Sequence, residues 1–167
     1  RIDADQVRQR PEQHIVAGLH LLQPIGPAAD HRLQRRLVEG FRVDGVLRQG
    51  HKMLIFGPSK AGKSFALIEL CIAIAEGTQW CGFQCTQGRV LYVNLELDRA
   101  SCLHRFKDVY TALDLRPDYI SNIDVWNLRG KSLPMDQLAP KLIRRAQKTN
   151  YIAIVIDPIY KIITGDE

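Results

Sequence analysis

The sequence predicts an α/β fold in which helices cover both faces of a mainly parallel sheet. Short apolar segments with strand character alternate with longer segments of helical periodicity. A glycine-containing loop joins the first of these strands to a helix, and two later strands end close to an acidic residue. A chain of 167 residues with 46% hydrophobic residues is long and apolar enough for one domain with a real core.

The first strand–loop–helix unit carries the pattern G-x-x-x-x-G-K-[ST] over residues 57–64. An apolar run from Lys52 to Phe56 precedes it, and a helical pattern that closes on Gly77 follows it. The backbone N–H groups of such a loop surround a phosphate, and the following helix directs its positive end toward it. The pattern predicts a nucleotide site formed by Gly57, Pro58, Ser59, Lys60, Ala61, Gly62, Lys63, Ser64 and Phe65.

Two residues of this loop and one later acid have expected roles toward ATP and Mg²⁺. Lys63 should reach the β- and γ-phosphate oxygens, and Ser64 should give its hydroxyl to Mg²⁺. The continuous apolar run from Tyr151 to Ile156 ends in Asp157, which is the Walker B pattern when it follows a P-loop. Asp157 is therefore expected to hold Mg²⁺ through a water beside Ser64.

The strand predicted over residues 89–96 ends in the polar residues Asn94 and Glu96. Ligands of open parallel sheets bind beyond the carboxyl ends of the strands, so an acid there faces the bound phosphates. Glu96 could deprotonate an attacking water, or it could cap the helix predicted over residues 99–113. Asp98 is the better cap because it directly precedes that helix, and we favour Glu96 as the catalytic base.

Several aromatic and basic residues have a structural and a functional interpretation. Trp80 and Phe83 lie in a loop or hairpin over residues 78–88, where packing over a sheet edge is the favoured role. His104 and Arg105 are expected on the solvated side of their helix. Cations at Arg129 and Lys131 could meet a phosphate or a DNA strand, but an exposed turn is the preferred interpretation.

The last predicted helix begins near Ser132, and Pro140 is expected to interrupt it or to start a new one. Its continuation over residues 141–148 has a basic face that we expect to be solvated. The strand over residues 120–128 precedes this helix.

Residues 1–40 are expected to form an arm or linker that is partly helical, and residues 41–167 an ATPase core that is incomplete at its carboxyl end. The arm could dock on a neighbouring domain or subunit, contact nucleic acid, or pack a solvated helix on the core, which is the favoured interpretation. Because the chain begins without Met and stops shortly after Asp157, we expect it to be part of a longer protein.

The net charge of +5 permits a nucleic-acid partner without requiring one, because a modest excess of arginine explains it equally well. No apolar run is long enough for a bilayer, and no signal peptide is recognisable, so a cytoplasmic protein with reduced thiols and no membrane partner is expected. Cys81 and Cys85 lack the second close pair that a zinc site needs.

The sequence resembles the RecA-like ATPases in residues 57–64, 92–98, 104–106, 126–130 and 154–158. The resemblance is greatest to the AAA-family plasmid RepA-type helicases, which are relatives of the DnaB replicative helicases. The resemblance implies a three-layer RecA-like P-loop fold and ATP hydrolysis with Mg²⁺, with Lys63 on the phosphates, Ser64 and Asp157 on Mg²⁺, and Glu96 as base. It also implies a homo-oligomer, often a hexameric ring, that moves on single-stranded DNA.

Three functions from different classes remain open on this basis. The favoured one is the ATP-hydrolysing motor of a DNA helicase or replication protein of a plasmid or mobile element. The alternative is a nucleotide-dependent DNA-binding or regulatory module with little hydrolysis. A small-molecule kinase ranks third, because no segment resembles the arginine-bearing lid that phosphate transfer to a metabolite requires.

Overall fold

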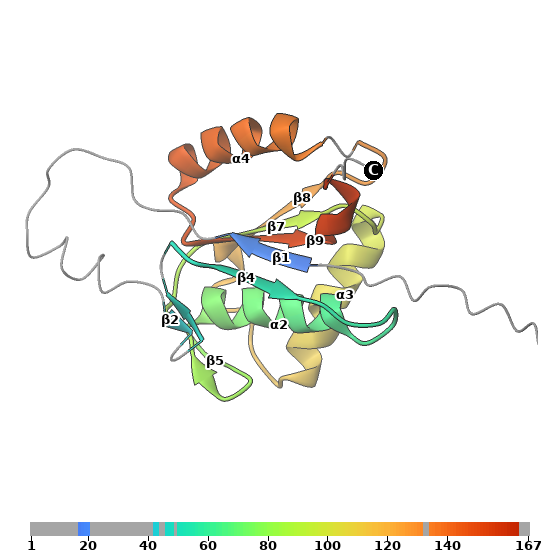
Figure 1. Cartoon of the computed structure of the whole chain (residues 1–167). Coiled ribbons are helices and arrows are strands. Elements are labelled where there is room, and N and C mark those ends of the chain that lie inside the picture. The colour runs from blue at the N-terminus through green and yellow to red at the C-terminus, as the bar shows by residue number, and fades with distance from the viewer. Residues whose placement is uncertain (1–16, 21–41, 44–45, 49, 132–133, 164–167) are drawn as a thin grey trace, which may run out of the picture.

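The computed structural model describes residues 17–20, 42–43, 46–48, 50–131 and 134–163. Its centre is a five-stranded sheet with the order β4-β1-β9-β7-β8 (Figure 1). The strands are β1 (Ala17–His20), β4 (Lys52–Ile55), β7 (Val90–Asn94), β8 (Ile123–Asn127) and β9 (Ala153–Asp157).

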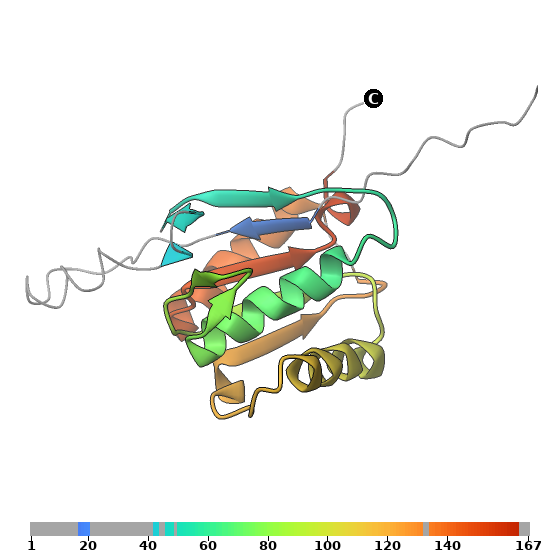
Figure 2. The same ribbon diagram turned by 90° about the horizontal axis from the view of Figure 1, so that it is seen from below.

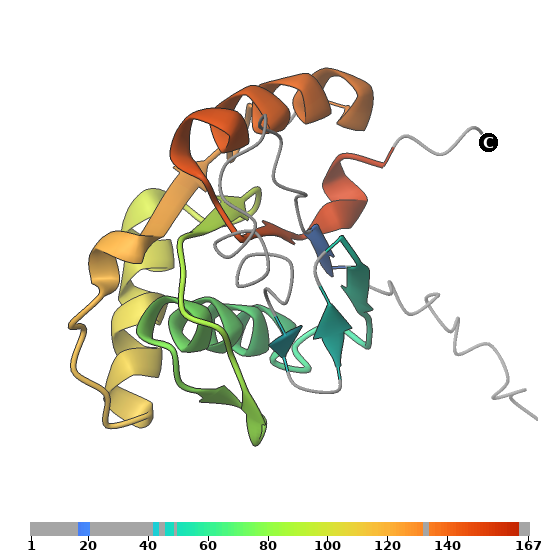
Figure 3. The same cartoon turned by 90° about the vertical axis from the view of Figure 1, so that its left-hand side faces the viewer.

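Helices cover both faces of this sheet, so the fold has the predicted three layers. Helices α2 (Lys63–Glu76) and α3 (Arg99–Ala112) lie on one face, and α4 (Met135–Thr149) lies on the other (Figures 1 and 3). The strand period of two divides the core accordingly: Val90 and Tyr92 pack with α2 and α3, whereas Leu91 and Val93 pack with α4. The predicted α/β P-loop fold class is confirmed.

Three strands of the sheet are parallel, and their carboxyl ends lie in one line. Strand β7 pairs with β8 and with β9, and Asn94 is in register with both Asn127 and Asp157. Parallel strands with covered faces are expected to be apolar throughout, and all five residues of β7 and of β9 are buried. The register therefore places the polar strand ends next to one another.

Strand β1 comes from the segment that the sequence assigned to an arm. It lies antiparallel between β4 and β9, so the strand before the P-loop is separated by one strand from the strand that ends in Asp157 (Figure 2). The helical part of the arm is predicted at the basic stretch of residues 30–38, which lies outside the described residues. The division of the chain at residue 40 stays a prediction.

The helix ends follow local sequence signals. Gly77, in the left-handed region with φ of 71°, ends α2 as predicted, and the Asp98 carboxylate caps α3 by accepting the Ser101 N–H at 2.9 Å. The prediction for Pro140 was wrong, because α4 continues through it. Burial of Leu138 and Leu142 beneath the helix outweighs the one hydrogen bond that Pro140 cannot donate.

Short elements complete the described structure. The aromatic segment forms the expected hairpin, in which Trp80 is buried and donates its Nε1–H to the carbonyl oxygen of Ala66 at 3.0 Å. Phe83 is 41% exposed, which corrects the expectation that both rings pack. No helix of the described residues is long and apolar enough to cross a bilayer. The remaining elements are β2 (Arg42–Val43), β3 (Leu47–Arg48), β5 (Gln79–Trp80), β6 (Phe83–Gln84) and the 3₁₀ turns Ile120–Asn122 and Ile159–Lys161.

Candidate functional site

A hollow of about 380 Å³ lies where the loop after β4 meets the ends of β7 and β9. Residues 59–65 of the loop line it, and so do Asn94, Glu96, Leu97, Arg105 and Asp157. The structure thus brings together most of the residues that the sequence singled out, including Lys63, Ser64, Phe65, Glu96 and Asp157. Gly57 and Pro58 do not line the hollow, but their carbonyl groups contact Lys63.

The loop has the backbone form that an anion site requires. Gly62 immediately precedes α2 and has a φ of 80°. Residues with a side chain rarely adopt this left-handed conformation. The first N–H groups of α2 have no intrahelical acceptors, and the helix dipole adds positive potential at the same end. The loop is therefore built to receive phosphate oxygens from its backbone side.

Lys63 is nearly buried, with 8% of its surface exposed, and its ammonium group is held within the loop. Its Nζ donates hydrogen bonds to the carbonyl oxygens of Gly57, at 2.8 Å, and Pro58, at 2.5 Å. A cation held beside free backbone donors fits the charge and the hydrogen-bonding capacity of a nucleotide phosphate chain.

Asp157 is 6% exposed at the end of β9 and has a fixed carboxylate. The Tyr92 hydroxyl donates to Asp157 Oδ2 at 2.5 Å. Burial and the neighbouring Asp157 carboxylate raise the pKa of Tyr92 well above its usual value, so this hydroxyl remains a donor at neutral pH. In the described part of the chain, no three His, Cys, Asp or Glu side chains gather to hold a metal ion, so Mg²⁺ would share phosphate and water oxygens with Asp157 and Ser64.

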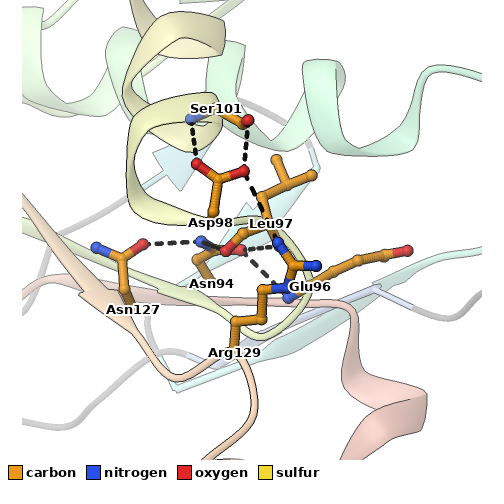
Figure 4. Close-up of polar contacts among 7 residues, drawn as sticks. All are labelled: Asn94, Glu96, Leu97, Asp98, Ser101, Asn127 and Arg129. Carbon is orange, nitrogen blue, oxygen red and sulfur yellow. Dashed lines mark hydrogen bonds and ion pairs between the residues drawn. The ribbon is translucent and has the colours of Figure 1, made fainter.

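Asn94 fixes the loop that follows β7. It is 2% exposed, and its Oδ1 accepts the N–H groups of Glu96, at 3.2 Å, and Leu97, at 2.9 Å (Figure 4). Its Nδ2 donates to the Leu97 carbonyl and to Asn127 Oδ1, both at 2.8 Å. No role for Asn94 was predicted from the sequence, although a polar residue at the end of an apolar strand is the signal for one.

Glu96 has a fixed backbone and a free side chain. Its carboxylate makes no hydrogen bond or ion pair with any residue in the described ranges, and it points away from the Asn94–Asn127 pair (Figure 4). The cap of α3 is Asp98, so the alternative role considered for Glu96 is filled by another residue. An exposed carboxylate at the rim of the hollow is available to a water molecule.

Arg105 lines the hollow together with Lys60 and Lys63, which corrects its expected solvated position. Its guanidinium carbon lies 5.2 Å from the centroid of the Phe65 ring, so α3 and the P-loop contact each other across the site. His104 is exposed and pairs with Asp108, as a solvated residue would. Arg129 is exposed and lies 3.8 Å from Asp98, a surface pair of little energetic weight.

The sequence was compared with models of known protein families, with curated proteins and with solved structures. Residues 31–167 match the family model described as an AAA domain. The chain belongs to the AAA domain family. No curated protein and no solved structure matches the chain. Proteins of this family are nucleotide-binding P-loop ATPases that generally use ATP with Mg²⁺, and this AAA domain carries the corresponding loop at residues 57–64.

Proposed function

We propose that this AAA domain binds ATP with Mg²⁺ and hydrolyses it, as the motor of a DNA helicase or replication protein of a plasmid or mobile element. One observation carries the proposal: a single hollow is lined by residues 59–65, by an exposed Glu96 whose carboxylate has no partner among the described residues, and by a buried, oriented Asp157. A phosphate site, a metal-binding oxygen and a free base are the three parts that hydrolysis of a nucleotide requires.

Different residues of the hollow would bind the phosphates and the Mg²⁺ ion. Lys63 and the N–H groups at the start of α2 would hold the phosphates, and Arg105 would add a second positive charge from α3. The Ser64 hydroxyl and the Asp157 carboxylate would hold Mg²⁺, which when bound neutralises charge on the phosphate oxygens.

Glu96 would act on the water nucleophile. A carboxylate oxygen of Glu96 would orient a water and accept its proton, a contribution of roughly 10²–10⁴-fold in rate. Asn94 would act through Glu96, because it fixes the backbone from which that side chain extends.

The proposed partner is single-stranded DNA, and the proposed assembly is a homo-oligomer in the form of a hexameric ring. Their support is the resemblance carried by residues 57–64, 92–98 and 154–158 to replicative helicases.

A nucleotide-dependent switch with little hydrolysis is the second candidate, and the position of Lys63 favours it. Its ammonium group is bonded to the carbonyls of Gly57 and Pro58, so a phosphate would have to draw it away. Such a rearrangement could signal nucleotide binding without turnover.

The test is ATP turnover by this chain and by Glu96→Gln, with and without single-stranded DNA, alongside nucleotide binding. The motor proposal predicts that both proteins bind ATP, and that only the unchanged chain shows DNA-stimulated turnover. Equal binding without turnover in either protein would favour the switch. Absence of nucleotide binding would reject both.

A further inference from the structure

A second hollow of about 380 Å³ lies on the opposite layer of the molecule, between α4 and the edge strand β8. Trp126 and four cations line it, namely Lys141, Arg144, Arg145 and Lys148. It shares no residue with the hollow at the P-loop. The proposed nucleotide site therefore does not account for it.

The four cations form one row on α4. Their spacing of i, i+3, i+4 and i+7 places them on a single face, and all four are exposed. None of them forms an ion pair with a residue of the described structure. At 1.5 Å per residue the row spans about 10 Å, over which a nucleic-acid strand with a 3.4 Å rise presents about three phosphates.

One member of this row forms a cation–aromatic pair. The Arg145 guanidinium carbon is 5.6 Å from the centroid of the half-buried Trp126 ring. The guanidinium therefore lies over the ring, and the Arg145 side chain is exposed. Bases stack on aromatic rings and on such guanidinium planes, so this pair can receive a base.

The neighbouring acid is already neutralised. Asp124 lies two residues before Trp126 on β8, and its carboxylate pairs with Arg89 at 3.1 Å and accepts the Tyr151 hydroxyl. The hollow thus combines cations that have no acidic partner among the described residues with a guanidinium that lies over an aromatic ring. An acidic peptide would use the cations but has no base to place on the plane.

We propose that α4 and Trp126 bind single-stranded nucleic acid, with phosphates on Lys141, Arg144 and Lys148 and a base stacked on Arg145. The proposal rests on the proposed function only for the identity of the strand as DNA. Binding at this surface requires no ATP.

The test measures the fluorescence anisotropy of a labelled oligodeoxythymidylate with the full chain and no nucleotide. The variant K141A/R144A/K148A should bind much more weakly, and its salt dependence, as the slope of log K against log salt, should fall by about two. The matched control K52A/K107A/R116A removes three other exposed cations and should bind like the unchanged chain.

A second pair of variants tests the stacking plane without loss of charge. Arg145→Lys should weaken binding about 5- to 150-fold while the salt slope stays the same, because lysine keeps the charge but has no plane. Trp126→Phe should retain binding, because phenylalanine can still support the guanidinium.

Four outcomes would overturn the proposal: no binding by the unchanged chain, equal binding by all variants, an unaffected Arg145→Lys variant, or competition by polyglutamate as effective as unlabelled oligodeoxythymidylate. ATP binding measured on the same proteins should be unchanged. If the unchanged chain does not bind ATP, the proposed function is rejected, but the proposed nucleic-acid binding by α4 and Trp126 is not affected.

Discussion

The carboxyl ends of β7 and β9 lie side by side in the sheet, yet they present their acidic side chains in opposite ways. Asp157 is the last residue of β9, is 6% exposed, and accepts a hydrogen bond from Tyr92. Glu96 lies two residues beyond β7, is exposed, and has no partner for its carboxylate in the described structure. A metal ligand benefits from a fixed position, whereas a base must meet a water and change its protonation.

The largest effect is expected from Glu96→Gln. ATP turnover should fall roughly 10²-fold or more, because the amide cannot accept a proton. Nucleotide affinity and the free energy of unfolding should not change, since the carboxylate has no hydrogen bond or ion pair to a described residue that could be lost. Steady-state kinetics, nucleotide titration and urea unfolding measure the three quantities. Asp118→Asn, an exposed acid far from the hollow in sequence, is the control; loss of affinity in Glu96→Gln would break the comparison.

Asp157→Asn should change metal dependence instead. The Mg²⁺ concentration for half-maximal turnover should rise at least about 10-fold, because the variant loses the charged oxygen ligand. The free energy of unfolding should change little, since the asparagine oxygen can still accept the Tyr92 hydroxyl. Turnover at a series of Mg²⁺ concentrations gives the answer, and an unaltered Mg²⁺ requirement would contradict the assigned metal role.

Asn94→Ala should lower the free energy of unfolding by about 1–3 kcal/mol, because buried N–H and C=O groups would lose their partners. Turnover should also fall, since the backbone of Glu96 would no longer be fixed. Asn127→Ala removes only one of these hydrogen bonds and is the milder counterpart. Urea unfolding separates the two variants; equal losses would mean that Asn94 contributes no more than its bond to Asn127.

Tyr92→Phe should lower the free energy of unfolding at neutral pH by about 1.5–3 kcal/mol at most, because it loses a hydrogen bond to a charged group. The effect of this substitution is easier to detect in the alkaline pH dependence of the free energy of unfolding. The folded-state pKa of Tyr92 is raised, so its contribution to stability is complete below the unfolded pKa of about 10 and is lost as pH rises further. Unfolding free energies measured from pH 8 upward should decline less steeply for Tyr92→Phe. If the free energy of unfolding declines equally steeply in both proteins, Tyr92 does not cause the loss of stability at high pH.

The elements that follow local rules could be predicted from the sequence. The P-loop needs Gly62 for a left-handed backbone, the first helix ends at Gly77, and Asp98 caps the next helix through its near neighbour Ser101. Each of these signals involves residues only a few positions apart.

The features that were missed depend on distant parts of the chain. Arg105 has the spacing of a solvated residue, and only the approach of α3 to the P-loop places it over Phe65. The role of Asn94 requires β8 beside β7, which brings Asn127 within hydrogen-bonding distance. The prediction for Pro140 followed the local rule that proline breaks a helix. In the structure, tertiary packing of Leu138 and Leu142 keeps α4 continuous through this residue.

Strand β1 has a consequence for the order of folding. Gly18 lies opposite Leu54 on one side and Ile156 on the other, so one short strand joins two segments that are far apart in the sequence. Pairings between such distant segments are slow, because a long loop must close before any contact compensates for it. During synthesis from the amino terminus, β1 can meet β4 long before β9 exists. The five-stranded sheet therefore reaches the described strand order only after β9 has been made.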